Sequence, residues 1–285
     1  MYHDRYILTL SCVDSRGIVA AVTTFLTQQY GFIIESGQFG DASTQHFFMR
    51  VEFSLQAGAP SLKMLRSLFA EQVGAPFDMR WDIFDKNKKA RVLVLVSKQG
   101  HCLHDLLYRT GTHQLPIEIP AIISNHPDMA SLAEWHKVPY HQFAEGESKP
   151  EQEKKILALV EQHHIDVVVL ARYMQILSPE LAAKLSGRAI NIHHSFLPSF
   201  KGARPYHQAF DRGVKLIGAT AHYVTDELDE GPIIEQEVAR VDHAHTPDDL
   251  AAIGRDIECQ VLTRALKYHV EHRVVLNGKK TVVFR

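Results

Sequence analysis

The chain has 285 residues and a net charge of −2, and 45% of its residues are hydrophobic. This apolar content predicts packed cores and argues against disorder, while the nearly balanced charge argues against a basic surface for nucleic acid or an anionic membrane. No apolar run approaches the ~20 residues that a membrane helix needs, and the few scattered cysteines are typical of reduced thiols, so we expect a cytoplasmic protein.

The first part of the chain is expected to form a small α+β domain over residues 1–86. Four runs are strand-like, at 6–12, 32–39, 47–53 and 78–84. Two segments carry apolar residues at helical spacing, at 18–30 and 61–73. The resulting order, βαββαβ, is the ferredoxin-like arrangement. A short charged stretch at 85–89 is the expected linker to a second domain over 87–285.

The second domain is expected to be a doubly wound α/β sheet. Continuous β-branched and leucine runs predict strands that are buried on both faces, as in a parallel sheet. The expected strands lie at 91–96, 117–124, 166–171, 189–192 and 218–224. Helical segments alternate with them, beginning at 102, 131, 151 and 178. In such a sheet the functional groups lie at the carboxyl ends of the strands.

Reactive side chains follow the expected strand at 189–192. Asn191 and His193 lie at its end, and Asp229 lies in a turn-like loop after the next apolar run. An amide, an imidazole and a carboxylate in one pocket suffice to hydrolyse or transfer an acyl group without a metal or a covalent intermediate. Each also has a structural alternative, as a loop cap, a surface histidine or a turn residue. His194 is expected to point away from His193 if the strand continues.

The spacing of these groups resembles the formyltransferase family that uses 10-formyltetrahydrofolate. That family has an N-I-H-x-S-x-L-P-x-x-x-G motif, then a strand with a further His and a D-x-x-D-x-G loop. The matching positions are Asn191, His193, Ser195, Leu197, Pro198, Gly202, His222, Asp226, Asp229 and Gly231. The resemblance runs from about residue 90 to the C-terminus. It implies a catalytic set of Asn191, His193 and Asp229, with no metal and no tightly bound cofactor.

The same resemblance implies where the folate substrate binds. In relatives, the loop after the strand at 166–171 wraps the pterin, and the loop around 225–228 closes the other side. The corresponding substrate-binding residues are Met174, Gln175, Ile176, Leu177, His222, Thr225, Asp226 and Glu227.

The acceptor side departs from the transferase pattern. Relatives that formylate glycinamide ribonucleotide carry a Gly-rich loop for its phosphate, whereas this chain has Lys98, Gln99 and His101 there. The combination of the small first domain with this second domain resembles the members of the family that hydrolyse 10-formyltetrahydrofolate, which implies water as the acceptor and formate and tetrahydrofolate as the products. The missing phosphate loop agrees with that resemblance. The formate would supply purine synthesis, and the reaction would balance one-carbon pools. Two alternatives stay open: a phosphoribosylglycinamide formyltransferase with a fused regulatory domain, and a non-catalytic folate or amino-acid sensor.

The first domain resembles an ACT domain, the small module that binds amino acids at paired interfaces. The residues that carry this resemblance, at the turn from the first strand to the first helix, are Asp14, Arg16, Gly17, Ile18 and Val19. It implies an amino-acid effector held by the free N–H groups of the helix. Glycine and methionine are the first candidates, because both draw on one-carbon units. Alternatively, the turn only caps the helix. Exposed strand edges favour a homo-oligomer, either a dimer or a tetramer.

Overall fold

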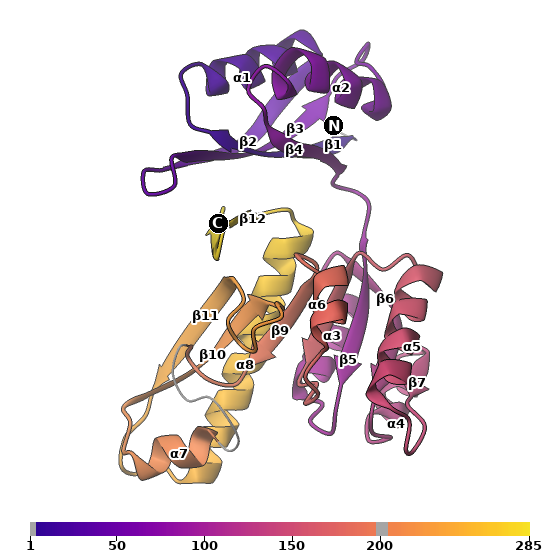
Figure 1. Cartoon of the computed structure of the whole chain (residues 1–285), viewed down its shortest axis with the longest axis vertical. Helices are drawn as coiled ribbons and strands as arrows, with labels where there is room; N and C mark the ends of the chain where they lie inside the picture. Colours follow the sequence, from indigo (N-terminus) through magenta and orange to yellow (C-terminus); the bar gives the residue numbers. More distant parts are fainter. Residues whose placement is uncertain (1–3, 198–204) are drawn as a thin grey trace. The chain divides into compact units, whose positions relative to one another are not determined.

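The structure is a computed structural model that describes residues 4–197 and 205–285 (Figure 1). It divides into two compact units. The first unit contains the chain up to Lys88 together with residues 271–277 and 282–285. The second contains residues 89–270 and 278–281. Within the described part of the chain, no helix is both long and apolar enough to cross a lipid bilayer.

The first unit has the expected ferredoxin-like order. Its elements are β1 (Arg5–Val13), α1 (Ile18–Gln28), β2 (Gly31–Asp41), β3 (His46–Leu55), α2 (Leu62–Phe69), a π-helical turn η1 (Ala70–Gly74) and β4 (Arg80–Asp85). The sheet is antiparallel throughout, in the order β2-β3-β1-β4. Buried side chains of the helices pack on this sheet and complete the core of the unit. There the rings of Phe25 and Phe69 contact edge to face, with 5.2 Å between their centroids.

Residues 271–277 and 282–285 belong to the first unit, whereas the sequence pattern assigns all of 87–285 to the second. The physical reason is the guanidinium of Arg50, which is 2% exposed and donates from Nε and Nη2 to the carbonyl oxygen of Glu271, at 3.3 and 3.2 Å. Arg273 Nη1 also forms an ion pair with Glu35 Oε1 at 3.2 Å. The ring of His272 stacks on that of Phe84, with 3.6 Å between the ring centroids. A buried cation needs such partners, so the segment is held in place.

The second unit contains one mixed, mostly parallel sheet. Its elements are β5 (Ala90–Val96), α3 (His101–Gly111), β6 (Ile117–Ser124), α4 (Ala130–Trp135), β7 (Tyr140–Gln142), α5 (Lys149–Gln162), β8 (Val167–Ala171), α6 (Pro179–Lys184), β9 (Ala189–His193), α7 (Pro205–Asp211), β10 (Leu216–Tyr223), β11 (Ile233–Arg240) and α8 (Pro247–Val270). The strand order is β11-β10-β9-β8-β5-β6-β7, and β10 alone pairs antiparallel with both of its neighbours. The doubly wound class expected from the sequence is confirmed.

Several elements were not anticipated from the sequence: β7, α7, β11, α8 and the terminal strands β12 (Val274–Asn277) and β13 (Lys280–Val283). The largest omission is α8, whose 24 residues pack along β10, β11 and β9. Its start does carry a signal. Thr246 and Asp249 exchange hydrogen bonds as a capping box, with Thr246 N donating to Asp249 Oδ2 at 2.8 Å, and Pro247 is the first helical residue.

Candidate active site

A cavity of about 210 Å³ lies in the second unit, between the segments that follow β8 and β9 and the loop that follows β10. Its lining includes every catalytic and substrate-binding residue expected from the sequence: Asn191, His193, Asp229, Met174, Gln175, Ile176, Leu177, His222, Thr225, Asp226 and Glu227. The lining also includes Arg172, at the start of the loop expected to wrap the pterin, and His194, which was expected to point away from His193.

The sheet itself aligns the polar groups of β9 and β10. Asn191 lies opposite His222, and His193 lies opposite Thr220, so the four side chains project from one face. Thr220 also ties down the segment after β9, because its hydroxyl donates to the Ser195 carbonyl at 2.9 Å. The motif positions Pro198 and Gly202 lie outside the described residues.

His193 is held by Asp229 and leaves one nitrogen for the cavity. Its Nδ1 lies 3.3 Å from Asp229 Oδ2, while its buried Nε2 has no hydrogen-bond partner among the described residues. An unpartnered buried nitrogen in a cavity wall is available to a ligand. The loop that carries Asp229 packs closely against the end of β10. A side chain at Gly231 would place its Cβ 1.7 Å from the Tyr223 carbonyl oxygen.

Asn191 is oriented by His222. The His222 Nδ1 lies 2.9 Å from the Tyr223 carbonyl oxygen, which can only accept, so Nδ1 carries the proton. Its Nε2 then accepts from the Asn191 Nδ2, at 3.2 Å. Because an amide nitrogen has two N–H groups, this bond fixes the Asn191 side chain and leaves its second N–H for another acceptor.

Asp229 is a fixed negative charge. Burial raises the pKa of its carboxyl, but the imidazoles of His193 and His222 beside it lower that pKa by more, to well below its usual range. The His222 Nε2 lies 3.7 Å from Asp229 Oδ1. The carboxylate therefore stays ionised at neutral pH, where it can orient His193 and stabilise an imidazolium.

His194 does not point away from the cavity. The expectation assumed that the strand continues, but β9 ends at His193, so strand alternation does not extend to the next side chain. The rings of His193 and His194 lie 5.1 Å apart, centroid to centroid. Burial, followed by the charges of Arg172 and His193, lowers the pKa of His194 to about 4. Its imidazole is therefore neutral at neutral pH.

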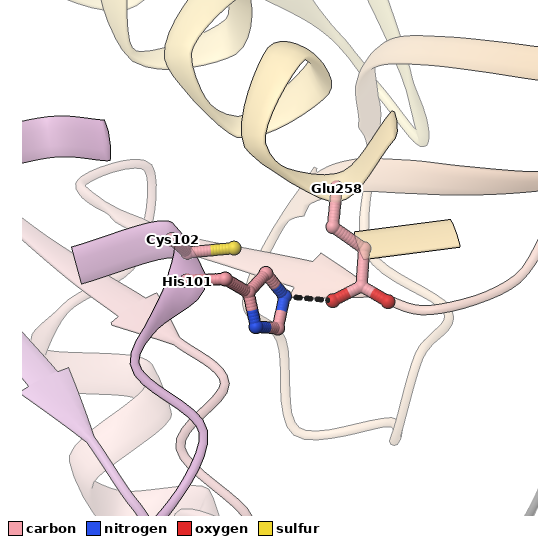
Figure 2. Close-up of side chains that lie close together, drawn as sticks. All are labelled: His101, Cys102 and Glu258. Carbon is pink, nitrogen blue, oxygen red and sulfur yellow. Dashed lines mark hydrogen bonds and ion pairs between the residues drawn. The ribbon is translucent and has the colours of Figure 1, made fainter. Parts of the chain in front are cut away.

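A buried charge network lies beside Arg172. Glu258 of α8 is only 1% exposed. The Tyr206 hydroxyl donates to its Oε1 at 2.7 Å. Its Oε2 lies 2.7 Å from His101 Nε2 and 3.4 Å from Arg172 Nε. Figure 2 shows the ring of His101 facing this carboxylate from α3. The sequence did carry one signal, because Glu258 occupies the apolar face of α8 with Gly254, Val261 and Leu262.

His101, Cys102 and Glu258 also place three metal-binding atom types within 4.8 Å of one another (Figure 2). Two observations favour a charge network over an ion site. The guanidinium of Arg172 already lies 3.4 Å from Glu258 and would repel a cation. A hydrogen bond with Cys259, together with burial, raises the pKa of the Cys102 thiol, whereas metals bind the thiolate.

The expected effector residues lie together in the first unit, at the start of α1. Gly17 precedes the helix with a φ of 94°, a conformation that favours glycine. No side chain of the described residues caps this helix end, so its first N–H groups are open to an external acceptor. Asp14 and Arg16 are exposed beside it, and Ile18 is buried beneath it.

Comparison with known proteins identifies the family of this chain. The family model described as formyl transferase matches residues 90–266. The formyltetrahydrofolate deformylases of Corynebacterium sp. (strain P-1) and Bacillus subtilis (strain 168) are 51% and 48% identical, over 99% of this chain and over 98% and 94% of theirs. The crystal structure of the formyltetrahydrofolate deformylase from Burkholderia mallei is 50% identical, with a TM-score of 0.93 over 99% of this chain and 100% of that chain. The chain therefore belongs to the formyl transferase family and, within it, to the formyltetrahydrofolate deformylases.

Proposed function

We propose that this protein is a hydrolase that cleaves the C–N bond of 10-formyltetrahydrofolate, giving formate and tetrahydrofolate. The observation that carries the chemistry is His193, whose Nδ1 faces a carboxylate while its buried Nε2 is unpartnered among the described residues. The full-length similarity to deformylases favours this reaction over formyl transfer to glycinamide ribonucleotide and over a non-catalytic sensor.

In the proposed mechanism, water attacks the formyl carbon and the carbonyl oxygen becomes an oxyanion. The second N–H of Asn191 and the Nε2–H of a protonated His193 donate to that oxygen. Asp229 accepts from Nδ1, which keeps Nε2 directed at the substrate and stabilises the positive charge. One well-placed donor of this kind lowers the barrier by roughly 3–4 kcal/mol.

The folate is proposed to lie against the apolar side chains at the cavity mouth. Met174, Ile176 and Leu228 are 59%, 60% and 58% exposed, which is costly for large apolar groups unless a ligand covers them. An aromatic ring system such as the pterin fits that requirement. Gln175, Leu177, Thr225, Asp226 and Glu227 complete the proposed binding residues. The reaction as proposed uses neither a metal nor a tightly bound cofactor.

The test is formate release from 10-formyltetrahydrofolate by the purified protein, with and without glycinamide ribonucleotide. We expect formate and tetrahydrofolate in equal amounts without the acceptor, and the same rate after dialysis against EDTA. A requirement for the ribonucleotide would show a transferase instead. Binding without turnover would show a sensor, and loss of activity that added zinc or iron restores would contradict the metal-free mechanism.

In the cell, the proposed reaction supplies formate for purine synthesis and balances the pool of one-carbon units. We place it in the cytoplasm, because Cys12, Cys102 and Cys259 are all free thiols, as is usual in a reducing compartment.

For the first unit we propose an ACT-like role in regulation and in the assembly of a dimer or tetramer, with glycine or methionine bound at Asp14, Arg16, Gly17 and Ile18. The start of α1, which no side chain in the described part of the chain caps, would receive the carboxylate of the amino acid. We expect activity to change with added glycine or methionine, and Arg16→Gln to weaken that response severalfold. Arg80→Gln, an exposed arginine of the same unit, serves as the control. An equal response in all three proteins would contradict the proposed site.

A further inference from the structure

We propose that His194 is the general base of the reaction, accepting a proton from the attacking water and then passing it to N10 of the folate. The inference deepens the proposed hydrolysis and rests on it. Its geometric basis is that His194 lines the same cavity as His193, with their ring centroids 5.1 Å apart and their planes 31° from each other. Water between these rings and the formyl carbon would be within reach of both.

The other proton acceptors of the described lining are committed or exposed. The two oxygens of Asp229 face His193 Nδ1 at 3.3 Å and His222 Nε2 at 3.7 Å. His222 itself uses Nδ1 toward the Tyr223 carbonyl and Nε2 toward Asn191.

The remaining carboxylates, Asp226 and Glu227, are exposed at the cavity mouth. His193 is needed as a donor to the oxyanion. Among these lining residues, His194 therefore remains as the group that can accept the proton of the attacking water.

Burial and the surrounding charges keep the His194 imidazole in its neutral form, which can accept a proton. Burial lowers its pKa first, then the nearby Arg172 and His193, while Glu258 and Asp229 act in the opposite direction, with a net pKa of about 4. The ring of Tyr206 is its further neighbour, at 6.4 Å. At neutral pH practically all His194 is neutral, and it is a stronger base than Asp229, whose pKa is held well below its usual range. Once protonated, it is a strong acid that readily gives the proton to the leaving nitrogen.

The charge network fixes the cation that tunes His194. Arg172 donates from Nε and Nη2 to Gln99 Oε1, at 3.2 and 3.0 Å, and its Nε lies 3.4 Å from Glu258 Oε2. Glu258 is in turn anchored by Tyr206 and faces His101 (Figure 2). Arg172 is therefore a positioning residue that acts through His194, and the network explains why a carboxylate is buried in α8.

The step balances without any further reactant. The oxygen of water bonds to the formyl carbon as one of its protons passes to His194, and the negative charge collects on the carbonyl oxygen near Asn191 and His193. When the carbonyl re-forms, the bond from carbon to N10 breaks and its electron pair stays on nitrogen. N10 takes the proton from His194, and the second proton of the water leaves to solvent as formic acid ionises to formate.

The first experiment measures kcat and KM of the full chain with 10-formyltetrahydrofolate. His194→Asn is expected to lower kcat by about 10²–10⁴-fold with little change in KM, and imidazole added to His194→Ala is expected to restore part of the rate. His207→Asn, an exposed histidine of the same unit, is the control and should keep the wild-type rate. A kcat of His194→Asn within a few-fold of wild type would overturn the assignment.

The second experiment records kcat/KM against pH, which a purely structural role would not affect. Wild-type activity should fall tenfold per pH unit below about 4, where His194 becomes protonated. Arg172→Met removes a positive charge, raises the pKa of His194 and should move this acid limb to higher pH. Arg172→Lys keeps the charge and should leave the limb in place. An acid limb that Arg172→Met leaves unmoved would refute the role of His194, whereas a wild type that releases no formate would refute the proposed function itself.

Discussion

Replacing Asp229 by Asn is expected to lower kcat by roughly 10²–10⁴-fold while the protein stays folded. The carboxylate lies 3.3 Å from His193 Nδ1, and its pKa is held well below the usual range by His193 and His222. An amide has nearly the same shape but no charge. It would no longer favour an imidazolium at His193, so the oxyanion would lose its charged donor.

The measurement is kcat from formate release, together with a thermal unfolding curve for the variant. Glu230→Gln makes the same chemical change at the next, exposed residue and should keep the wild-type rate. Near-wild-type turnover of Asp229→Asn would remove Asp229 from the catalytic set.

Replacing Asn191 by Ala is expected to lower kcat by about 10²–10³-fold, the usual effect of removing one oxyanion donor. KM should change little, because the donor acts on charge that develops only in the transition state. Stability should also fall, by about 1–3 kcal/mol, because His222 Nε2 is buried and loses the Asn191 amide that lies 3.2 Å away.

The control is Asn87→Ala, the same substitution in an exposed turn, which should alter neither kcat nor the melting temperature appreciably. If Asn191→Ala raised KM and left kcat unchanged, Asn191 would be a ground-state binding residue and the oxyanion role would be wrong.

The sequence predicted the elements whose pattern is local. The run at 166–171 reads as a strand buried on both faces, and β8 is wholly buried there. The spaced motif around Asn191 and His193 could be matched position by position, because it depends on neighbours along the chain. The Asp229 loop could be found for the same reason.

Features built from distant parts of the chain could not be predicted in this way. The partners of Glu258 come from positions 101, 172 and 206, so no window of sequence contains them. The α8 helix was missed because its buried face is interrupted by Gly254 and Glu258, which weakens the apolar period. The orientation of His194 was predicted from the alternation of side chains along a strand, but β9 ends at His193, one residue earlier.

The buried Arg50 has a consequence for how this protein can be divided. Its guanidinium draws the end of the chain into the first unit, and the ring of Phe284 rests against Gly37, where an added Cβ would lie 2.8 Å from it. The N-terminal unit is therefore not a module that a single cut after residue 86 can release. Such a cut would strip the neighbours from His272 and Phe284 and leave a short β-hairpin exposed as a site for misassembly. Any recombination that exchanges this unit between relatives must carry residues 4–88 together with residues 271–285.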